Sequence, residues 1–219
     1  MPMSIEISGF NWVPDFARGY VRDLRPRWAC EEVGLAYTMR LLSPVPPKPA
    51  AYFHEQPWGQ VPVLHDNDVQ LFESGAILLH LGERDERLLP REPQARATAI
   101  AWLFAALNSV EPWLFELANV EIFSAGEEWA KLRKPSLLKD TGKRLDGLME
   151  ALGGREWLGD AFSVADIAMV TVLRNADHAD LMSSRPRLAD YVARGTARPA
   201  FQRALAAQLA DFRPEPVAA

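Results

Sequence analysis

Glu73 and Ser74 are the residues whose types and position most directly suggest chemistry. A strand-like tetrad, 69–72, precedes them, and a helix is expected from about residue 74 to 83. The first N–H groups of a helix have no internal partner and carry partial positive charge, which suits a carboxylate. Ser74 would add a hydroxyl, and Glu73 would add a carboxylate that attracts an amine. The joint could therefore hold both ends of a zwitterion, the alternative being a simple helix cap.

The cysteine, the histidines and the Ser163–Asp166 pair exclude several kinds of catalytic and metal site. Cys30 is the one cysteine, so no internal disulfide, CxxC pair or four-cysteine zinc site can form. The four histidines lack HExxH or His-x3-His spacing, and no metal site is expected. Ser163 and Asp166 have the spacing of a capping box, and no neighbouring histidine supports a catalytic pair. Cys30 itself is interpreted as a small core residue on a helix.

Composition narrows the class of protein further. The chain has 219 residues, 48% of them hydrophobic, with 24 Lys+Arg against 29 Asp+Glu and a net charge of −5. These values are typical of a globular protein, and the absence of long basic runs argues against a nucleic-acid partner. The longest apolar run, 99–107, is too short to span a membrane, and no membrane association is expected. Because residues 1–6 show no leader pattern, a cytoplasmic location is expected.

The pattern of elements predicts two regions. Strand-like segments at 5–7 and 37–42 enclose a helix ending at Gly34, and a proline-rich loop, 43–49, follows. Two tetrads, 61–64 and 69–72, read as a hairpin before the helix that starts at Ser74. A charged segment with two prolines, 85–93, looks like a linker, so we expect domains at 1–84 and 94–219. Apolar stripes at helical spacing predict that the second is all-helical, with Pro112 opening or kinking its first long helix.

Four segments in this order resemble the glutathione S-transferase family. In chain order, they are the helix segment 27–35, Gly59-Gln60-Val61-Pro62-Val63-Leu64, Leu71-Phe72-Glu73-Ser74-Gly75-Ala76-Ile77, and Phe162-Ser163-Val164-Ala165-Asp166-Ile167. The resemblance covers nearly the whole chain. It implies an α+β fold in which a thioredoxin-like α/β domain precedes an all-α bundle, with glutathione as co-substrate.

The resemblance also implies roles for particular residues. Val61–Pro62 would form a cis peptide bond, and the free N–H and C=O of Val61 would pair with the cysteinyl part of glutathione as an added strand. Glu73 and Ser74 would hold the γ-glutamyl group, and Gln60 would reach the glycyl carboxylate. A small hydrophobic electrophile would bind in an apolar cleft between the domains, and a homodimer is expected, with the tryptophan-rich bundle and the Phe72 neighbourhood as contacts.

The group that activates the thiol is the point where the sequence departs from the family. A transferase of this kind must stabilise a thiolate, through a hydroxyl or a cation near sulfur. Ungapped alignment back from Gly34 puts Tyr20 at the position of the family's activating residue, with Arg18 second and Asn11 third in order of preference. Pro26 is tolerated if Asp23 is the N-cap, because Pro26 then falls at the third helical position.

Two other functions stay open on sequence alone. One is a non-catalytic module that keeps the glutathione S-transferase fold for binding or assembly, consistent with the departure around Tyr20. The other is a thiol-disulfide reductase that uses Cys30. Loss of turnover in Tyr20→Phe would favour the transferase.

Overall fold

The computed structural model describes residues 5–179 and 181–214, apart from the side chains of residues 177–179. The expectation that the chain has no leader segment rests on residues 1–6, of which 1–4 lie outside the described residues. The described residues divide into two compact units, one formed by 5–88 with 198–214 and the other by 89–197. Among them, no helix is both long and apolar enough to cross a bilayer.

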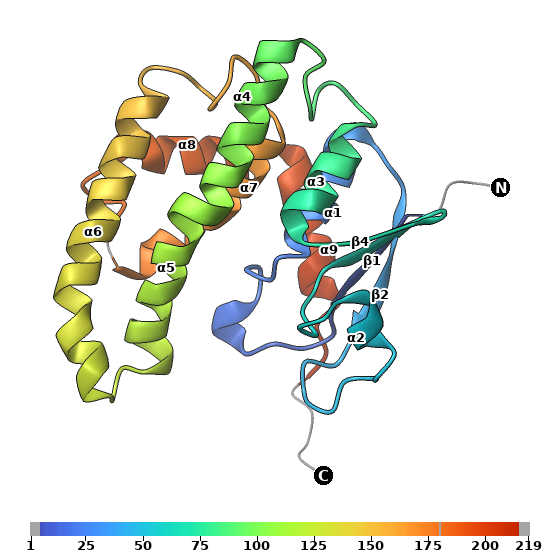
Figure 1. The fold of residues 1–219 in the computed structure, drawn as a ribbon, viewed down its shortest axis with the longest axis horizontal. Coiled ribbons are helices and arrows are strands. Elements are labelled where there is room, and N and C mark those ends of the chain that lie inside the picture. The colour runs from blue at the N-terminus through green and yellow to red at the C-terminus, as the bar shows by residue number, and fades with distance from the viewer. Residues whose placement is uncertain (1–4, 180, 215–219) are drawn as a thin grey trace. The chain divides into compact units, whose positions relative to one another are not determined.

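The first unit is built on a mixed four-stranded sheet with the strand order β2-β1-β3-β4 (Figure 1). Strands β1 and β2 are parallel, as expected for a β-α-β unit, whereas β3 runs antiparallel to both β1 and β4. Its elements are β1 (Ile5–Phe10), the short helix η1 (Asp15–Ala17), α1 (Leu24–Val33), β2 (Tyr37–Leu42), α2 (Tyr52–Glu55), β3 (Val63–Asp66), β4 (Val69–Phe72), α3 (Ser74–Gly82) and α9 (Pro199–Ala210).

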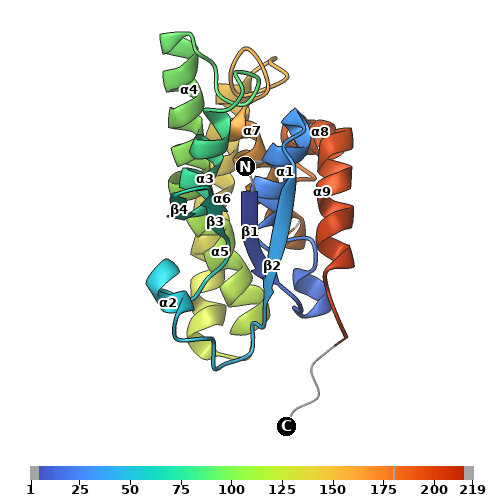
Figure 2. The same cartoon turned by 90° about the vertical axis from the view of Figure 1, so that its right-hand side faces the viewer.

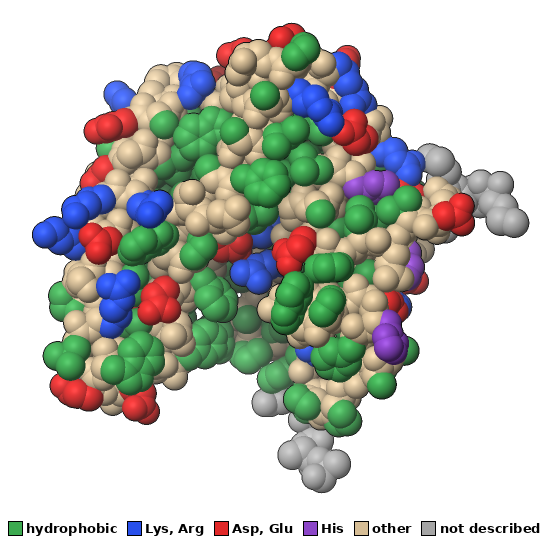
Figure 3. Space-filling view, viewed as in Figure 1, with side chains coloured by type: hydrophobic (Ala, Val, Ile, Leu, Met, Phe, Trp, Pro, Cys, Tyr) green, Lys and Arg blue, Asp and Glu red, His purple; other side chains and the backbone are tan. Residues whose placement is uncertain are grey.

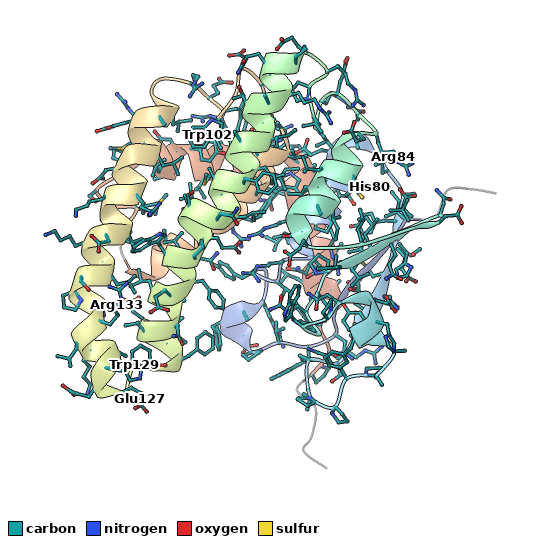
Figure 4. All side chains as sticks on the ribbon, in the orientation of Figure 1. His80, Arg84, Trp102, Glu127, Trp129 and Arg133 are labelled. Atoms are coloured by element: carbon teal, nitrogen blue, oxygen red, sulfur yellow. The ribbon has the colours of Figure 1, made fainter. Side chains whose placement is uncertain are left out.

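Strand β3 begins two residues later than the sequence suggested, at Val63 instead of Val61. The reason is Pro62, which has no N–H to donate and follows a cis peptide bond, so the two residues stay outside the ladder. The hairpin turn then falls at Asn67, whose φ of 53° is one that asparagine tolerates. His80 and Arg84, labelled in Figure 4, both donate to the buried carboxylate of Asp66 and so tie α3 to this hairpin.

Helix α9 packs along α1 and belongs to the first unit, and the two helices lie side by side in Figure 2. Trp28 of α1 is fully buried, and its ring meets that of Phe201 edge to face, with 4.9 Å between centroids. Arg198 donates to both carboxylate oxygens of Glu32 at 2.6 and 2.7 Å. Helix α9 thus supplies apolar cover to α1 and lies with the first unit, although the sequence pattern placed all of 94–219 in one helical domain.

The second unit is helical and is centred on α7, whose residues are all buried. Ser163 caps this helix and Asp166 returns a carboxylate to the Ser163 N–H at 2.9 Å, which confirms the predicted capping box. The chain opens into a π-helical turn just before Pro112, as the proline predicted. The elements are α4 (Pro93–Phe104), η2 (Ala105–Val110), α5 (Glu111–Ala118), η3 (Asn119–Phe123), α6 (Glu128–Leu152), α7 (Val164–Leu173), η4 (Arg174–Ala179) and α8 (Pro186–Thr196).

Candidate functional site

The Val61–Pro62 peptide bond is cis, as the family resemblance implied, and both residues are buried between α2 and β3. Val61 packs in a cluster with Tyr52 and Val63, against which Val21 and Phe10 also pack. The residue that follows Tyr20 in sequence therefore lies at the loop that would hold the cysteinyl group. Packing between residues that are distant in sequence thus brings the segment around Tyr20 to the Val61–Pro62 peptide bond.

A chain of hydrogen bonds holds the residues on either side of this loop. The Tyr52 hydroxyl donates to the carbonyl of Gln60 at 2.7 Å, so its oxygen is left to accept from the Ser8 hydroxyl at 2.9 Å. Ser8 Oγ in turn accepts from the N–H of Val63 at 2.7 Å. Ser8 and Tyr52 are almost completely buried, so water does not compete for these bonds.

Gln56 completes the fixation of Gln60. Its side-chain oxygen accepts from the N–H groups of Trp58 and Gln60 at 2.7 and 3.0 Å, and the residue is 3% exposed. Both backbone groups of Gln60 are thus bonded, while its side chain is exposed and available to a ligand. Neither Tyr52 nor Gln56 was singled out from sequence, because their partners are backbone groups whose positions only the fold defines.

Glu73 and Ser74 occupy the strand-to-helix joint that the sequence predicted. Glu73 has a φ of 70°, a left-handed conformation that is rare for a residue other than glycine and is typical of functional sites. Its side chain makes no capping bond, and the residue is exposed. Ser74 begins α3 and is buried, with the first N–H groups of the helix beside it. This geometry presents hydrogen-bond donors and one acidic side chain at a single point.

Arg25 is a member of this site that sequence reasoning missed. Its Nη1 donates to Ser74 Oγ at 2.9 Å, and the residue is only 3% exposed. A buried guanidinium beside a helix N-terminus makes the joint strongly attractive to a carboxylate. The available signal was a charged residue at the second position of α1, in a helix whose first seven residues are all buried.

Lys48, in the proline-rich loop, is a second addition. Its Nζ donates to the carbonyl of Gly59 at 2.5 Å and lies 5.2 Å from the centre of the Phe10 ring. The cation therefore stands next to Gln60. Sequence reasoning interpreted segment 43–49 only as a rigid loop, because the position of a lysine relative to residue 59 depends on how the loop folds back.

The three candidates for thiol activation lie in the segment between β1 and α1. Asp23 is the N-cap of α1 and Pro26 its third residue, which is the condition under which Pro26 is tolerated, so Tyr20 stands just before a helix N-terminus. The Tyr20 N–H donates to the carbonyl of Ala17 at 3.1 Å. Tyr20 is half-buried.

The other two candidates have defined partners. Arg18 Nε lies 3.2 Å from a carboxylate oxygen of Asp15, and the guanidinium lies 5.9 Å from the centre of the Phe212 ring. The Asn11 N–H donates to the carbonyl of Leu42 at 2.9 Å. Neither contact involves Val61, Pro62 or α3, so all three assignments stay predictions.

Cys30 does not offer a reactive thiol. Its side chain is fully buried, and burial raises the pKa of the thiol to about 12, so it carries essentially no thiolate at neutral pH. A reductase mechanism through Cys30 therefore lacks its nucleophile. In the part of the chain that the structure describes, no three His, Cys, Asp or Glu side chains are grouped as a metal site would require.

Comparison with known proteins agrees with this geometry. The profile for "Glutathione S-transferase, N-terminal domain" matches residues 17–83, and that for "Glutathione S-transferase, C-terminal domain" matches 116–194. Glutathione S-transferase GstA of Escherichia coli O157:H7 is 31% identical over 163 residues, which cover 72% of this chain and 78% of the relative. Glutathione S-transferase F14 of Arabidopsis thaliana is 31% identical over 160 residues, covering 66% of this chain and 62% of the relative.

A solved structure extends the likeness to nearly the whole chain. The glutathione transferase of Burkholderia graminis, described with two glutathione molecules bound per subunit, superposes with a TM-score of 0.80 and 25% identity. The superposition covers 93% of this chain and 88% of that one. The two domain matches, the relatives and this superposition agree, and the chain belongs to the glutathione S-transferase family.

Proposed function

We propose that this chain is a glutathione transferase that binds glutathione on its first unit and promotes attack of the thiolate on a small apolar electrophile. The observation that carries the proposal is the pairing of Arg25 with Ser74 at the start of α3, beside Glu73. This joint matches a γ-glutamyl head, which carries a carboxylate and an amine on one carbon. The carboxylate would meet Ser74, Arg25 and the helix N-terminus, and the amine would meet Glu73.

The rest of the tripeptide fits the remaining groups. The backbone N–H and C=O of Val61 would pair with the cysteinyl residue as an added strand, since Val61 and Pro62 stand outside the β3 ladder. The glycyl carboxylate would reach Gln60 and Lys48, which lie next to each other. Each charged end of glutathione would thus face an opposite charge or a hydrogen-bond donor.

Thiol activation falls to the segment before α1. The pKa of a free cysteine thiol is about 8.5, so a donor near sulfur is needed to increase the thiolate fraction at neutral pH. Tyr20 is our first candidate for this donor, followed by Arg18 and Asn11. The electrophile is small and apolar, and Phe16, on the same segment and 47% exposed, would contact it.

We also propose a homodimer that acts in the cytoplasm, where glutathione is the main thiol. Trp58 is 64% exposed and packs edge to face on Phe72, with 5.7 Å between ring centroids. The second unit has its own exposed apolar side chains at the start of α6, where Figure 4 labels Trp129 and Figure 3 shows hydrophobic side chains at the surface. Trp129 is 47% and Leu132 74% exposed. Apolar surface of this kind on both units favours self-association.

The proposal is tested by calorimetric titration of the protein with glutathione, beside Ser74→Ala and Glu73→Gln. Each variant removes one polar partner of the γ-glutamyl group, and we expect the Kd to rise by about tenfold or more. Glu86→Gln is the matched control, because Glu86 is an exposed carboxylate of the same unit. Binding that is equal in all four proteins would contradict the assignment of the site.

Turnover separates the transferase from a non-catalytic module. We expect the wild type to conjugate a generic electrophile and Tyr20→Phe to lose most of that rate while keeping its Kd for glutathione. Glutathione binding without turnover over a panel of electrophiles would favour the module instead.

A further inference from the structure

The last described residues of the chain contact the segment that carries the three candidates for thiol activation. Gln208, at the end of α9, is buried, and its Nε2 donates to the carbonyl of Val21 at 3.1 Å and to Asp23 Oδ1 at 2.8 Å. These bonds join α9 to the residues directly after Tyr20. They fix the end of the segment that enters α1.

The beginning of the same segment is held by residues beyond α9. The Arg213 N–H donates to the carbonyl of Asn11 at 2.7 Å. Between these two points, the Phe212 ring lies under the guanidinium of Arg18 at 5.9 Å. Residues 208–213 therefore contact the 11–23 segment at its start, in its middle and at its end.

A buried charge network anchors these residues to α1. Asp211 accepts from Arg27 Nη2 at 2.6 Å, and Arg27 Nε donates to Asp23 at 2.8 Å. The side chains of Arg27 and Asp23 are at most 2% exposed, so removing Arg27 would leave the carboxylate of Asp23 buried without its counterion. Residues 208–213 are thus bound to the first turn of α1 as well as to the segment before it.

The 11–23 segment needs such support. Apart from the bond from the Asn11 N–H to the Leu42 carbonyl at its start, the backbone bonds described within it are local turns, such as Ala17 to Pro14 and Tyr20 to Ala17. A segment of this length without strand pairing loses much conformational entropy when it is ordered. Contacts with a rigid neighbour at both ends lower that cost by fixing where the segment starts and finishes.

We propose that residues 208–213, called here the C-terminal brace, position the 11–23 segment for thiol activation. The inference rests on the proposed transferase function. Residues 208–213 make none of the bonds described above to Val61, Pro62 or α3, so the brace acts on the activating group more than on glutathione binding. Loosening it should lower kcat and raise the pKa of the bound thiol without changing the Kd for glutathione.

The test compares two shortened chains. A chain that ends at Ala210 loses the Asp211, Phe212 and Arg213 contacts, and a chain that ends at Pro214 keeps them all. We expect the shorter chain to lose about tenfold in kcat, since a small misplacement of a catalytic group has effects of this size or larger. Its thiolate absorbance with bound glutathione should titrate at higher pH, and amides of 11–23 should exchange hydrogen faster.

Point variants keep the test decisive if the shorter chain folds poorly. Gln208→Ala removes the bonds to Val21 and Asp23, and Phe212→Ala removes the ring under Arg18. Leu209→Ala is the control on the same helix, because Leu209 is 44% exposed. Gln208→Ala and Phe212→Ala should each lower kcat severalfold at constant Kd, and Phe212→Tyr should restore it.

The outcomes separate the two proposals. Unchanged kcat, thiol titration and exchange in all the brace variants of an active protein would overturn the brace and leave the transferase assignment standing. A wild-type protein that binds no glutathione would overturn the transferase assignment and the brace with it. A parallel rise in Kd and fall in kcat would show that these residues only stabilise the fold, which also overturns the brace.

Discussion

Tyr52 is the residue that fixes the backbone on both sides of Val61 and Pro62. Its hydroxyl bonds the Gln60 carbonyl on one side and Ser8 on the other, and Ser8 holds Val63. Because these bonds bracket Val61 and Pro62, the position of the Val61 N–H and C=O depends on them.

We predict that Tyr52→Phe raises the KM for glutathione by about three- to tenfold with little change in kcat. The variant leaves the Gln60 carbonyl without its donor, which should also cost about 1 kcal/mol of stability. Steady-state kinetics at varied glutathione give the KM, and urea unfolding gives the stability.

Tyr37→Phe is the matched control, because its hydroxyl, in the same unit, makes a long 3.5 Å contact with Glu31. If Tyr52→Phe lost stability while its KM matched that of Tyr37→Phe, the role of Tyr52 in orienting the loop would be wrong.

Helix α2 is the element that carries Tyr52, and one carboxylate joins it to two strands. Glu55 accepts from Arg40 of β2 at 2.9 Å and lies 2.8 Å from Nε2 of His65 in β3. The Arg40 hydrogen bond, with His65 adding to it, lowers the pKa of Glu55 to about 2. A four-residue helix is too short to be stable alone, so this link helps to keep Tyr52 in place.

We predict that the stability lost in Glu55→Gln depends on pH. The pKa of Glu55 is about 2 in the folded chain and 4.5 in the absence of structure. The Arg40–Glu55 ion pair therefore stabilises the fold fully above pH 4.5 and progressively less as the pH falls toward 2. The difference in unfolding free energy between wild type and Glu55→Gln, from urea curves at several pH values, should shrink over this window. A difference that stays constant from neutral pH down to pH 3 would contradict the assignment.

Elements with local signals were the ones that sequence predicted well. The N-cap at Asp23, the capping box at Ser163 and the opening before Pro112 each depend on a few neighbouring residues, and all three are confirmed. The cis bond at Val61–Pro62, also confirmed, came from the family resemblance. Contacts between distant segments were missed, because Arg25 meets Ser74 across 49 positions and no local pattern pairs them.

At the scale of the whole molecule, contacts between distant segments also decide how the chain divides into two compact units. The charged, proline-containing segment 85–93 predicts a boundary, and the division between the two units lies within it, between Leu88 and Leu89. No comparable local pattern in the sequence indicated that α9 packs with the first unit. It accompanies the buried face of α1, where the fully buried Trp28 packs on Phe201 of α9.

We predict that a fragment of residues 1–88 does not fold cooperatively, whereas the same fragment joined to 198–214 by a flexible linker does. The first fragment exposes Trp28 and leaves Glu32 and Asp23 without Arg198 and Gln208. Within the full chain, Phe201→Ala should cost about 3–5 kcal/mol, the usual effect of deleting a buried aromatic ring. Urea unfolding followed by circular dichroism measures all three proteins.

The expected contrast is a broad, non-cooperative change for the short fragment and a sigmoidal transition for the linked one. Leu209→Ala in the full chain is the control, since this side chain lies on the exposed face of the same helix. A sigmoidal transition in the short fragment, at the midpoint of the linked one, would mean that α9 is dispensable for the first unit. The cover of α1 would then add only stability, and the brace would have to act through the segment before α1 alone.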